Sequence, residues 1–470
     1  VYKLCKTKTT FFKDLGIPGP RPHLIYGNLR EVYREGTLKV TEEWASKYGD
    51  VVGYFHGFRP VMIIRDPELL KQIFIKHFDS FTARQRIVEL STVLPVNTVK
   101  LTRVSGDKWR KLRALTSPAF KSSTLKRAFS IIDECAEEFL EIMEETAQKR
   151  EGLDISKHFS RLSMDILSRF TMGVKINAQA ASKETELLIN YARGSVGQFA
   201  LTWILFFSDI KKVIVFVRAR SFELPSSILQ EHIAYLVRLR RAKAENENHD
   251  LLQQMFNAEE NYDEKKNQAV NGNERRHVMR NRHDADTSRG VPRMTQFETE
   301  ANAELFIVAG LETVATALSF TTYLLAKHQD VQDKARAEIT FFLEKDVDIN
   351  YDNIFKMQYL NQVIAESLRF YPPLPGIVTR RCEKDFEFNG YRIPKETNIN
   401  VPVRLLHHDP RYWTDPEEFN PDRFSPENKA TIEPMAYIPF GIGPRNCIAS
   451  RFAEMELALI IVKILTKYKL

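Results

Sequence analysis

Cys447 is the residue of this chain whose setting best suits chemistry. It follows a glycine-rich turn that contains Gly441, Gly443 and Arg445, and an apolar helical stretch comes after it. Backbone N–H groups of a tight turn and the start of a helix stabilise a thiolate, so we expect a lowered thiol pKa. The two glycines allow φ values closed to other residues and a close approach to a flat ligand. These residues predict a thiolate ligand, and the alternative is a buried structural cysteine.

An acid and an alcohol interrupt the apolar stretch Ala309-Gly310-Leu311-Glu312-Thr313. Polar side chains are uncommon in such a stretch, and a glycine within a helix costs about 1 kcal/mol relative to alanine. Glu312 and Thr313 could therefore move protons. The alternative is a packing glycine, with the Thr313 hydroxyl bonded to the preceding turn.

Two further pairs have helical spacing. Glu366 and Arg369 are three residues apart, an arrangement common on exposed helices and worth about 0.2–0.5 kcal/mol there. Trp109 and Arg113 are four apart and share a helix face. That face could bind a carboxylate, because the guanidinium group donates hydrogen bonds in pairs. It could also be a solvated basic face with one tryptophan anchored in the core.

Helices are expected to position most of these residues. Thr295 and Glu298 have capping-box spacing, and nothing breaks the pattern until His328, which predicts a helix of roughly 50 Å through the middle of the protein. Residues 51–64 and 386–393 each predict a β-hairpin. We predict a mainly α fold with a small β-rich lobe. A further helix has one apolar face, formed by Leu125, Phe129, Ile132, Ala136, Phe139 and Met143.

Composition excludes several classes of protein. The chain has 470 residues, is 43% hydrophobic, and has a net charge of +7 without an arginine-rich arm, which gives no support for nucleic-acid binding. No run of 18 apolar residues indicates a membrane span. Residues 257–294 are polar and predict a mobile surface linker. The cysteines are dispersed, which argues against disulfides and zinc; they are Cys5, Cys135, Cys382 and Cys447.

In combination, these motifs resemble those of the cytochrome P450 family across nearly the whole chain. Phe440 to Cys447 resembles the haem-thiolate loop, with Ala449 in place of the last family glycine. Ala309 to Thr313 resembles the oxygen-activation motif, with Val314 replacing its second threonine. The remaining match is a buried structural charge cluster, formed by Glu366, Arg369 and the segment Pro421-Asp422-Arg423-Phe424, where Asp422 replaces the commoner glutamate.

The resemblance implies a cytochrome P450 fold (a triangular prism) in a single domain over 1–470, with haem b held by an axial cysteine thiolate. Cys447 would be the only protein ligand to the iron. Ala309 and Gly310 would leave room for O₂ over the haem, and Glu312 and Thr313 would loosen the helix and deliver protons. The haem-binding residues would be Arg84, Trp109, Arg113, Arg380, Phe440, Arg445 and Cys447.

The implied activity is monooxygenation of lipophilic small molecules, such as xenobiotics, steroids or fatty-acid-like compounds, in the manner of animal microsomal family-3 enzymes. Electrons would come from NADPH–cytochrome P450 reductase, with cytochrome b5 as an optional partner. Lys108, Arg110 and Lys111 would face outward as a dock for the reductase. Two alternatives are a haem-thiolate isomerase or dehydratase of lipid peroxides and a non-catalytic binder of haem and hydrophobic ligands.

The resemblance also bears on the location. Val1 and the proline-rich segment 15–22 suggest a chain whose N-terminal anchor is absent, on the cytosolic face of the endoplasmic reticulum membrane, and the extreme C-terminus would be absent too. The apolar runs 199–207 and 213–217 are either core helix or a lid that dips into the membrane interface. His407-His408 invites a metal site, but local packing is the preferred interpretation.

Overall fold

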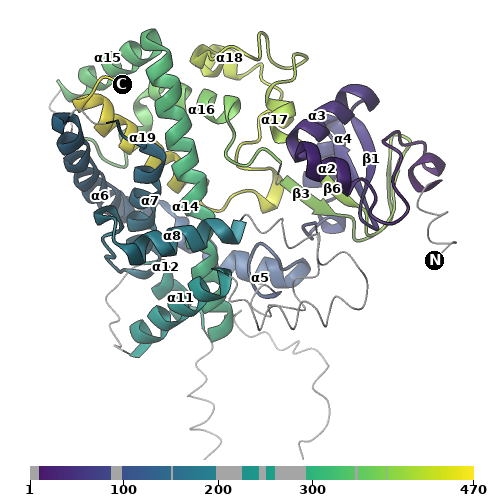
Figure 1. Cartoon of the computed structure of the whole chain (residues 1–470), viewed down its shortest axis with the longest axis horizontal. Helices are drawn as coiled ribbons and strands as arrows, with labels where there is room; N and C mark the ends of the chain where they lie inside the picture. The colour runs from purple at the N-terminus through teal and green to yellow at the C-terminus, as the bar shows by residue number, and fades with distance from the viewer. Residues whose placement is uncertain are drawn as a thin grey trace, which may run out of the picture.

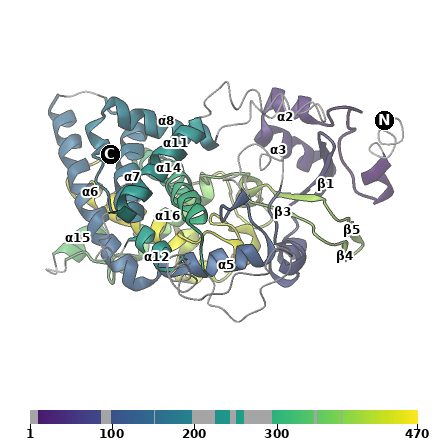
Figure 2. The same cartoon turned by 90° about the horizontal axis from the view of Figure 1, so that it is seen from below.

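A large helical part and a smaller strand-containing part make up the protein (Figure 1). The computed structural model describes residues 10–85, 98–149, 152–196, 225–242, 250–259, 293–344, 348–376 and 378–470. Figure 2 shows helix α14 between the other helices, among them α7 and α6, on one side and strands β1 and β3 on the other. The mainly α fold with a small β-rich lobe is as predicted.

Helix α14 (Gln296–Lys327) is the predicted long helix, with 32 residues. Its capping box is complete: Thr295 Oγ1 accepts a hydrogen bond from the Glu298 N–H at 3.2 Å, and Glu298 Oε2 accepts one from the Thr295 N–H at 2.9 Å. The helix packs mainly against α7 (Ile155–Met172). By length and composition it is the one described helix that could cross a membrane, and half of its most apolar window is buried inside the fold.

Helix α6 (Ser122–Lys149) confirms the predicted apolar face, since Leu125, Phe129, Ile132, Ala136 and Phe139 are all buried. It packs against α7 and α19 (Ser450–Lys467). The other principal helices of this part are α5 (Gly106–Thr116), α8 (Lys183–Val196), α11 (Pro225–Ala242), α12 (Leu251–Asn257), α15 (Gln329–Leu343) and α16 (Gln358–Phe370).

The main sheet has the strand order β1-β2-β6-β3. Strands β1 (Val51–His56) and β2 (Arg59–Ile64) form the predicted antiparallel hairpin. Strand β6 (Asn398–Val401) lies parallel to β2, with Asn398 opposite Val61, and β3 (Val378–Arg381) lies antiparallel to β6. The sheet thus places Arg380 on a strand beside β6. The short helices of this part are α2 (Leu29–Glu35), α3 (Thr37–Tyr48), α4 (Pro67–Lys71) and α17 (Val403–His407), whereas α18 (Pro426–Lys429) lies on the side of α16.

The second predicted hairpin is also present, as β4 (Phe386–Phe388) and β5 (Tyr391–Ile393). Asn389 and Gly390 take φ values of 47° and 81°, the left-handed conformation that a tight two-residue turn requires.

The predicted bounds of the linker, 257 and 294, are both wrong. Asn257 is the last residue of α12, and Met294 is fully buried and forms a β-bridge with Glu259. Met294 can be buried because its apolar side chain fills the main core. Residues 260–292 lie outside the described residues, as do the apolar runs 199–207 and 213–217.

The proline-rich segment near the N-terminus lies against the sheet. The Gly53 N–H donates to the Pro18 carbonyl at 2.9 Å. A Cβ atom on Gly19 would lie 1.9 Å from the Gly53 carbonyl oxygen, so this contact requires glycine. The segment is therefore docked on β1.

Candidate functional site

The loop that carries Cys447 lies between the sheet and the N-terminal end of α19. Its ends are joined by a hydrogen bond of 2.8 Å from the Cys447 N–H to the Phe440 carbonyl. Cys447 is exposed, whereas Cys135 and Cys382 are buried. Among the cysteines that the structure describes, Cys447 is thus the one that a ligand can reach.

The two glycines of this loop have the predicted backbone conformation. Gly441 and Gly443 have φ values of 74° and 71°. A Cβ atom on Gly443 would lie 2.0 Å from the Phe74 carbonyl oxygen. The loop therefore approaches the backbone of Phe74 closely at Gly443, and the predicted approach to a flat ligand stays a prediction.

The prediction of a lowered pKa for Cys447 is wrong for the protein alone. Surrounding protein atoms raise the pKa of this thiol by desolvation, although its surface is exposed. The backbone N–H of Ala449 and the guanidinium groups of Arg113 and Arg84 act in the opposite direction. The expected turn and helix-start effect is present, but desolvation outweighs it.

Arginine side chains gather beside the cysteine loop. Arg445 donates to the backbone carbonyls of Leu101 and Val104, both at 2.9 Å. Arg380 donates to the Ile442 carbonyl at 3.3 Å, and Arg84 donates to the Arg445 carbonyl at 3.4 Å. Three of the predicted cofactor-binding arginines are therefore brought together.

Within the described parts of the chain, these arginines form no ion pair with an acidic residue. Among the described residues, neither Arg84, Arg380 nor Arg445 forms an ion pair, and Nε of Arg84 and Nε of Arg380 are buried without a hydrogen-bond partner. Burial lowers the pKa of Arg445 to about 9 and lowers that of Arg380 well below its ordinary value, and repulsion from Arg84 lowers both. Glu383 attracts Arg445, but its carboxylate binds Thr82 and the Ala83 N–H. The cluster is thus suited to a ligand with several negative charges.

Helix α5 places Trp109 and Arg113 on the same side of this cluster, as their spacing predicts. Arg113 donates to the carbonyl and the side-chain oxygen of Asn446, at 2.9 and 3.1 Å. Trp109 is buried, and the Arg445 guanidinium lies over its ring at 5.3 Å. Both residues therefore adjoin the loop that carries Cys447.

Two of the three cations of the predicted basic dock on α5 lie beside acidic residues. Arg110 pairs with Asp79 and Asp107, at 2.5 and 2.8 Å. Lys111 lies 3.9 Å from Glu298, at the start of α14. Lys108 is exposed. Two of the three cations thus have acidic neighbours, and the role of all three in docking the reductase stays a prediction.

The central part of α14 presents Ala309 and Thr313 on one face. Ala309 is exposed, and the Thr313 hydroxyl donates to the Ala309 carbonyl at 2.8 Å. A Cβ atom on Gly310 would lie 2.8 Å from a methyl carbon of Leu167 in α7. The missing side chain of Gly310 thus lets α14 pack closely on α7, and its predicted role in leaving room for O₂ stays a prediction.

Glu312 is held by a residue that the sequence does not single out. Its carboxylate accepts a hydrogen bond from Arg193 Nε at 2.8 Å, and Arg193 Nη2 donates to Ser160 Oγ at 2.6 Å. Arg193 belongs to α8 and Ser160 to α7, so three helices meet at this pair. The pair is partly exposed, with 32% and 39% of the two side chains accessible.

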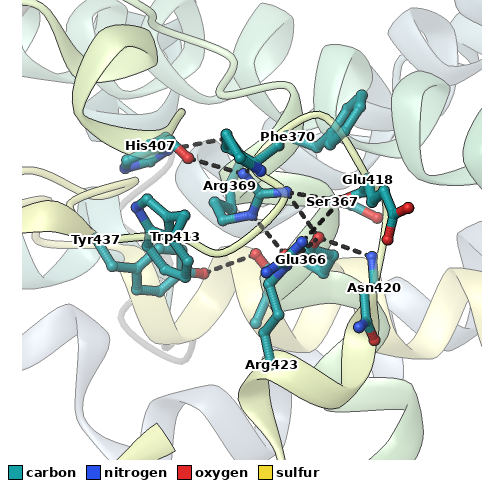
Figure 3. A network of polar contacts seen from close by, with 12 residues as sticks. Glu366, Ser367, Arg369, Phe370, His407, Trp413, Glu418, Asn420, Arg423 and Tyr437 are labelled. Atoms are coloured by element: carbon teal, nitrogen blue, oxygen red, sulfur yellow. Dashed lines mark hydrogen bonds and ion pairs between the residues drawn. The ribbon is translucent and has the colours of Figure 1, made fainter. Parts of the chain in front are cut away.

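The Glu366–Arg369 pair is fully buried, as the resemblance implies (Figure 3). Arg369 Nε and Nη2 bind the two carboxylate oxygens of Glu366 at 2.7 and 2.8 Å. The remaining Arg369 donors bind the carbonyls of His407, Pro416 and Glu418, at 2.8, 2.9 and 3.0 Å. Every charge of the pair is therefore compensated, which a buried pair requires.

Arg423 completes the predicted three-way cluster, with its Nε 3.4 Å from Glu366 Oε1. The Asn420 N–H donates to the same oxygen at 2.9 Å. Asp422 is exposed and is not part of the charge cluster, so a glutamate at this position is not needed.

His407, for which local packing is the interpretation preferred from the sequence, also joins two distant backbone segments by hydrogen bonds. It is fully buried, and burial lowers its pKa to about 3. Its ring nitrogens bind the backbone of Arg369, as Figure 3 shows, and the backbone of Ile438, which precedes the cysteine loop. His408 instead binds the Phe370 carbonyl and Glu417.

Comparison with known proteins agrees with this geometry. The family model described as "Cytochrome P450" matches residues 17–470. The chain belongs to the cytochrome P450 family. It is 32% identical over 465 residues to cytochrome P450 3A41 of Mus musculus, which covers 97% of this chain and 86% of that protein. The identity to cytochrome P450 3A5 of Homo sapiens is also 32%, over 466 residues, with the same coverage.

A third relative is named for its activity. The lithocholate 6-beta-hydroxylase of Mesocricetus auratus is 32% identical over 472 residues, which are 98% of this chain and 86% of that enzyme. Membership of this family makes the chain a monooxygenase of lipophilic compounds that carries haem b on a cysteine thiolate. The residues present fit this cofactor: haem has two propionate groups, and no ion pair joins Arg84, Arg380 or Arg445 to a carboxylate of the described residues.

Proposed function

We propose that this cytochrome P450 binds haem b through Cys447, with the propionates on the arginine cluster. The observation that carries the proposal is that Arg84, Arg380 and Arg445 lie beside the exposed thiol without an acidic partner among the described residues. Desolvated cations of this kind are costly unless an anion joins them. A haem placed between the loop and α14 would offset that cost with its carboxylates.

The neighbouring arginines also favour the thiolate form of Cys447. Arg113 and Arg84 already lower the pKa of Cys447, while desolvation raises it. A metal ion deprotonates a coordinating thiol, so the thiolate would form when the iron binds. Trp109 and Arg113 would hold a propionate from the α5 side.

On the α14 side, Thr313 and Glu312 would handle protons. Bound haem supplies oxygen activation and the insertion of one oxygen atom into a substrate bond. The Thr313 hydroxyl, bonded to the Ala309 carbonyl, would turn toward the cofactor to donate. Glu312 would exchange protons with solvent, since its ion pair with Arg193 is partly exposed. Exposed Ala309 would leave room beside the cofactor.

We infer that the substrates are bulky lipophilic compounds such as steroids, fatty-acid-like molecules or xenobiotics. The name of the hamster relative, a lithocholate 6-beta-hydroxylase, supports a steroid-like compound. The electron donor would be NADPH–cytochrome P450 reductase, with cytochrome b5 as an optional second donor, at the cytosolic face of the endoplasmic reticulum membrane. Exposed Lys108 supports an acidic partner on the α5 side.

Reconstitution with the reductase tests this function. With a panel of lipophilic compounds, we expect steady NADPH consumption and products that contain one atom of ¹⁸O from ¹⁸O₂. Conversion of lipid hydroperoxides without NADPH or O₂ would instead identify an isomerase or dehydratase. Ligand binding without turnover under either condition would identify a non-catalytic binder.

A further inference from the structure

His407 connects the buried charge network to the cysteine loop. Its Nε2 lies 2.9 Å from the Ile438 nitrogen, and its Nδ1 lies 3.1 Å from the Arg369 carbonyl oxygen. Because the Ile438 N–H can only donate, Nε2 must be unprotonated, and Nδ1 then carries the proton and donates to Arg369. The ring is thus fixed in one neutral tautomer between α16 and the loop, and Figure 3 shows its contact with Arg369.

Hydrogen bonds continue from Ile438 to the cysteine. The Ile438 carbonyl accepts from the Gly441 N–H at 3.0 Å, and the Phe440 carbonyl accepts from the Cys447 N–H at 2.8 Å. Both bonds belong to the turn that presents Cys447. The position of Ile438 therefore determines where this turn begins.

The residue before Ile438 is tied to the same helix. The Tyr437 ring stacks on His407 at 5.5 Å, and the Tyr437 hydroxyl donates to the Ala365 carbonyl at 3.0 Å. Ile438 is only 2% exposed, so its N–H has no access to water if the imidazole is removed. A buried donor without a partner is unfavourable, and the loop would shift to hydrate it.

We propose that His407 is a positioning residue, which holds the start of the cysteine loop through Ile438 and thereby keeps Cys447 bound to the haem iron. The inference rests on the proposed function, since it takes Cys447 as the ligand. Any movement of the loop would shift the sulfur, because the turn between Ile438 and Cys447 is closed by backbone bonds.

The test compares His407→Phe, which keeps a ring but no polar atom, with His407→Gln, which keeps a donor and an acceptor. His408→Phe is the matched control, because the hydrogen bonds of His408 go to the end of α16 and to Glu417. For each holoenzyme we would follow, in mild urea, the loss of the thiolate-specific absorption band of the reduced CO complex. The urea midpoint of unfolding would be measured in parallel.

We expect His407→Phe to lose this band about tenfold faster than the wild type, the factor that corresponds to about 1.4 kcal/mol. His407→Gln should restore most of the difference, and His408→Phe should match the wild type. If His407→Phe loses the band at the wild-type rate, or only in step with global unfolding, the positioning role is wrong. If the wild type itself shows no thiolate band, the proposed function fails instead.

Discussion

Replacing Arg369 with alanine removes the centre of the buried charge network. Both side chains of the Glu366–Arg369 pair have 0% accessibility. Without Arg369, the Glu366 carboxylate keeps only Arg423 at 3.4 Å and the Asn420 N–H at 2.9 Å. Breaking such a buried pair costs about 3–5 kcal/mol. This is a large share of the roughly 5–15 kcal/mol that stabilises a folded domain.

We therefore expect Arg369→Ala to yield protein that loses haem, rather than a folded but slow enzyme. The segment 407–424 would detach from α16, because Arg369 also binds the carbonyls of His407 and Glu418. The assay is the haem-to-protein ratio after purification, together with the urea midpoint of unfolding. Arg369→Lys should be intermediate, since one ammonium group cannot replace the guanidinium fork.

Arg34→Ala is the matched control. Arg34 pairs with Glu35 at 2.7 Å, as Arg369 does with Glu366, but its side chain is 70% exposed. Exposed pairs contribute little, so this variant should behave as the wild type. A soluble Arg369→Ala with full haem content and an unchanged midpoint would refute the reasoning.

Three further predictions follow from the site and its surroundings. Thr313→Ala should leave haem binding intact but release more hydrogen peroxide per NADPH consumed. Thr322 forms a similar hydrogen bond to the preceding turn of the same helix, so Thr322→Ala should not change the peroxide yield. An equal peroxide yield from both variants would make Thr313 a packing residue. Lys108→Glu should slow reductase-driven turnover and flatten its salt dependence, because salt screens the attraction between Lys108 and an acidic partner over about 8 Å. Turnover driven by peroxide, which does not need the reductase, should stay constant. An equal fall in both rates would contradict a docking role for Lys108. Burial raises the pKa of Glu456 to about 8 from an ordinary 4.5, so the folded state binds the extra proton and stability should fall as pH rises between these values, by at most about 1.4 kcal/mol per pH unit. Glu456→Gln should flatten this slope in urea titrations from pH 5 to 8, and a slope equal to that of the wild type would show that Glu456 does not cause it.

Many helices and turns of the fold could be predicted because the sequence patterns that specify them involve neighbouring residues. The capping box at Thr295 and the Asn389-Gly390 turn depend on neighbouring residues, and both are present. Trp109 and Arg113 share a face because residues four apart lie on the same side of a helix. Cys447 stands out because the glycines around it require positive φ values.

The remaining features depend on contacts between distant segments. Arg193 and Glu312 are 119 residues apart along the chain, and no spacing rule brings them together. The direction in which Gly310 faces depends on the approach of α7. His407 gives no sequence signal beyond its neighbour His408, because its partners are backbone atoms of Arg369 and Ile438.

The central claim is that Cys447 is the axial ligand, and the reduced CO spectrum tests it most directly. Cys447→Ser should abolish the absorption band that gives the cytochrome P450 family its name, since that band requires a thiolate opposite CO. Cys382→Ser, which alters a buried cysteine of the other lobe, should keep it. A band retained in Cys447→Ser would contradict the assignment of Cys447 as the ligand.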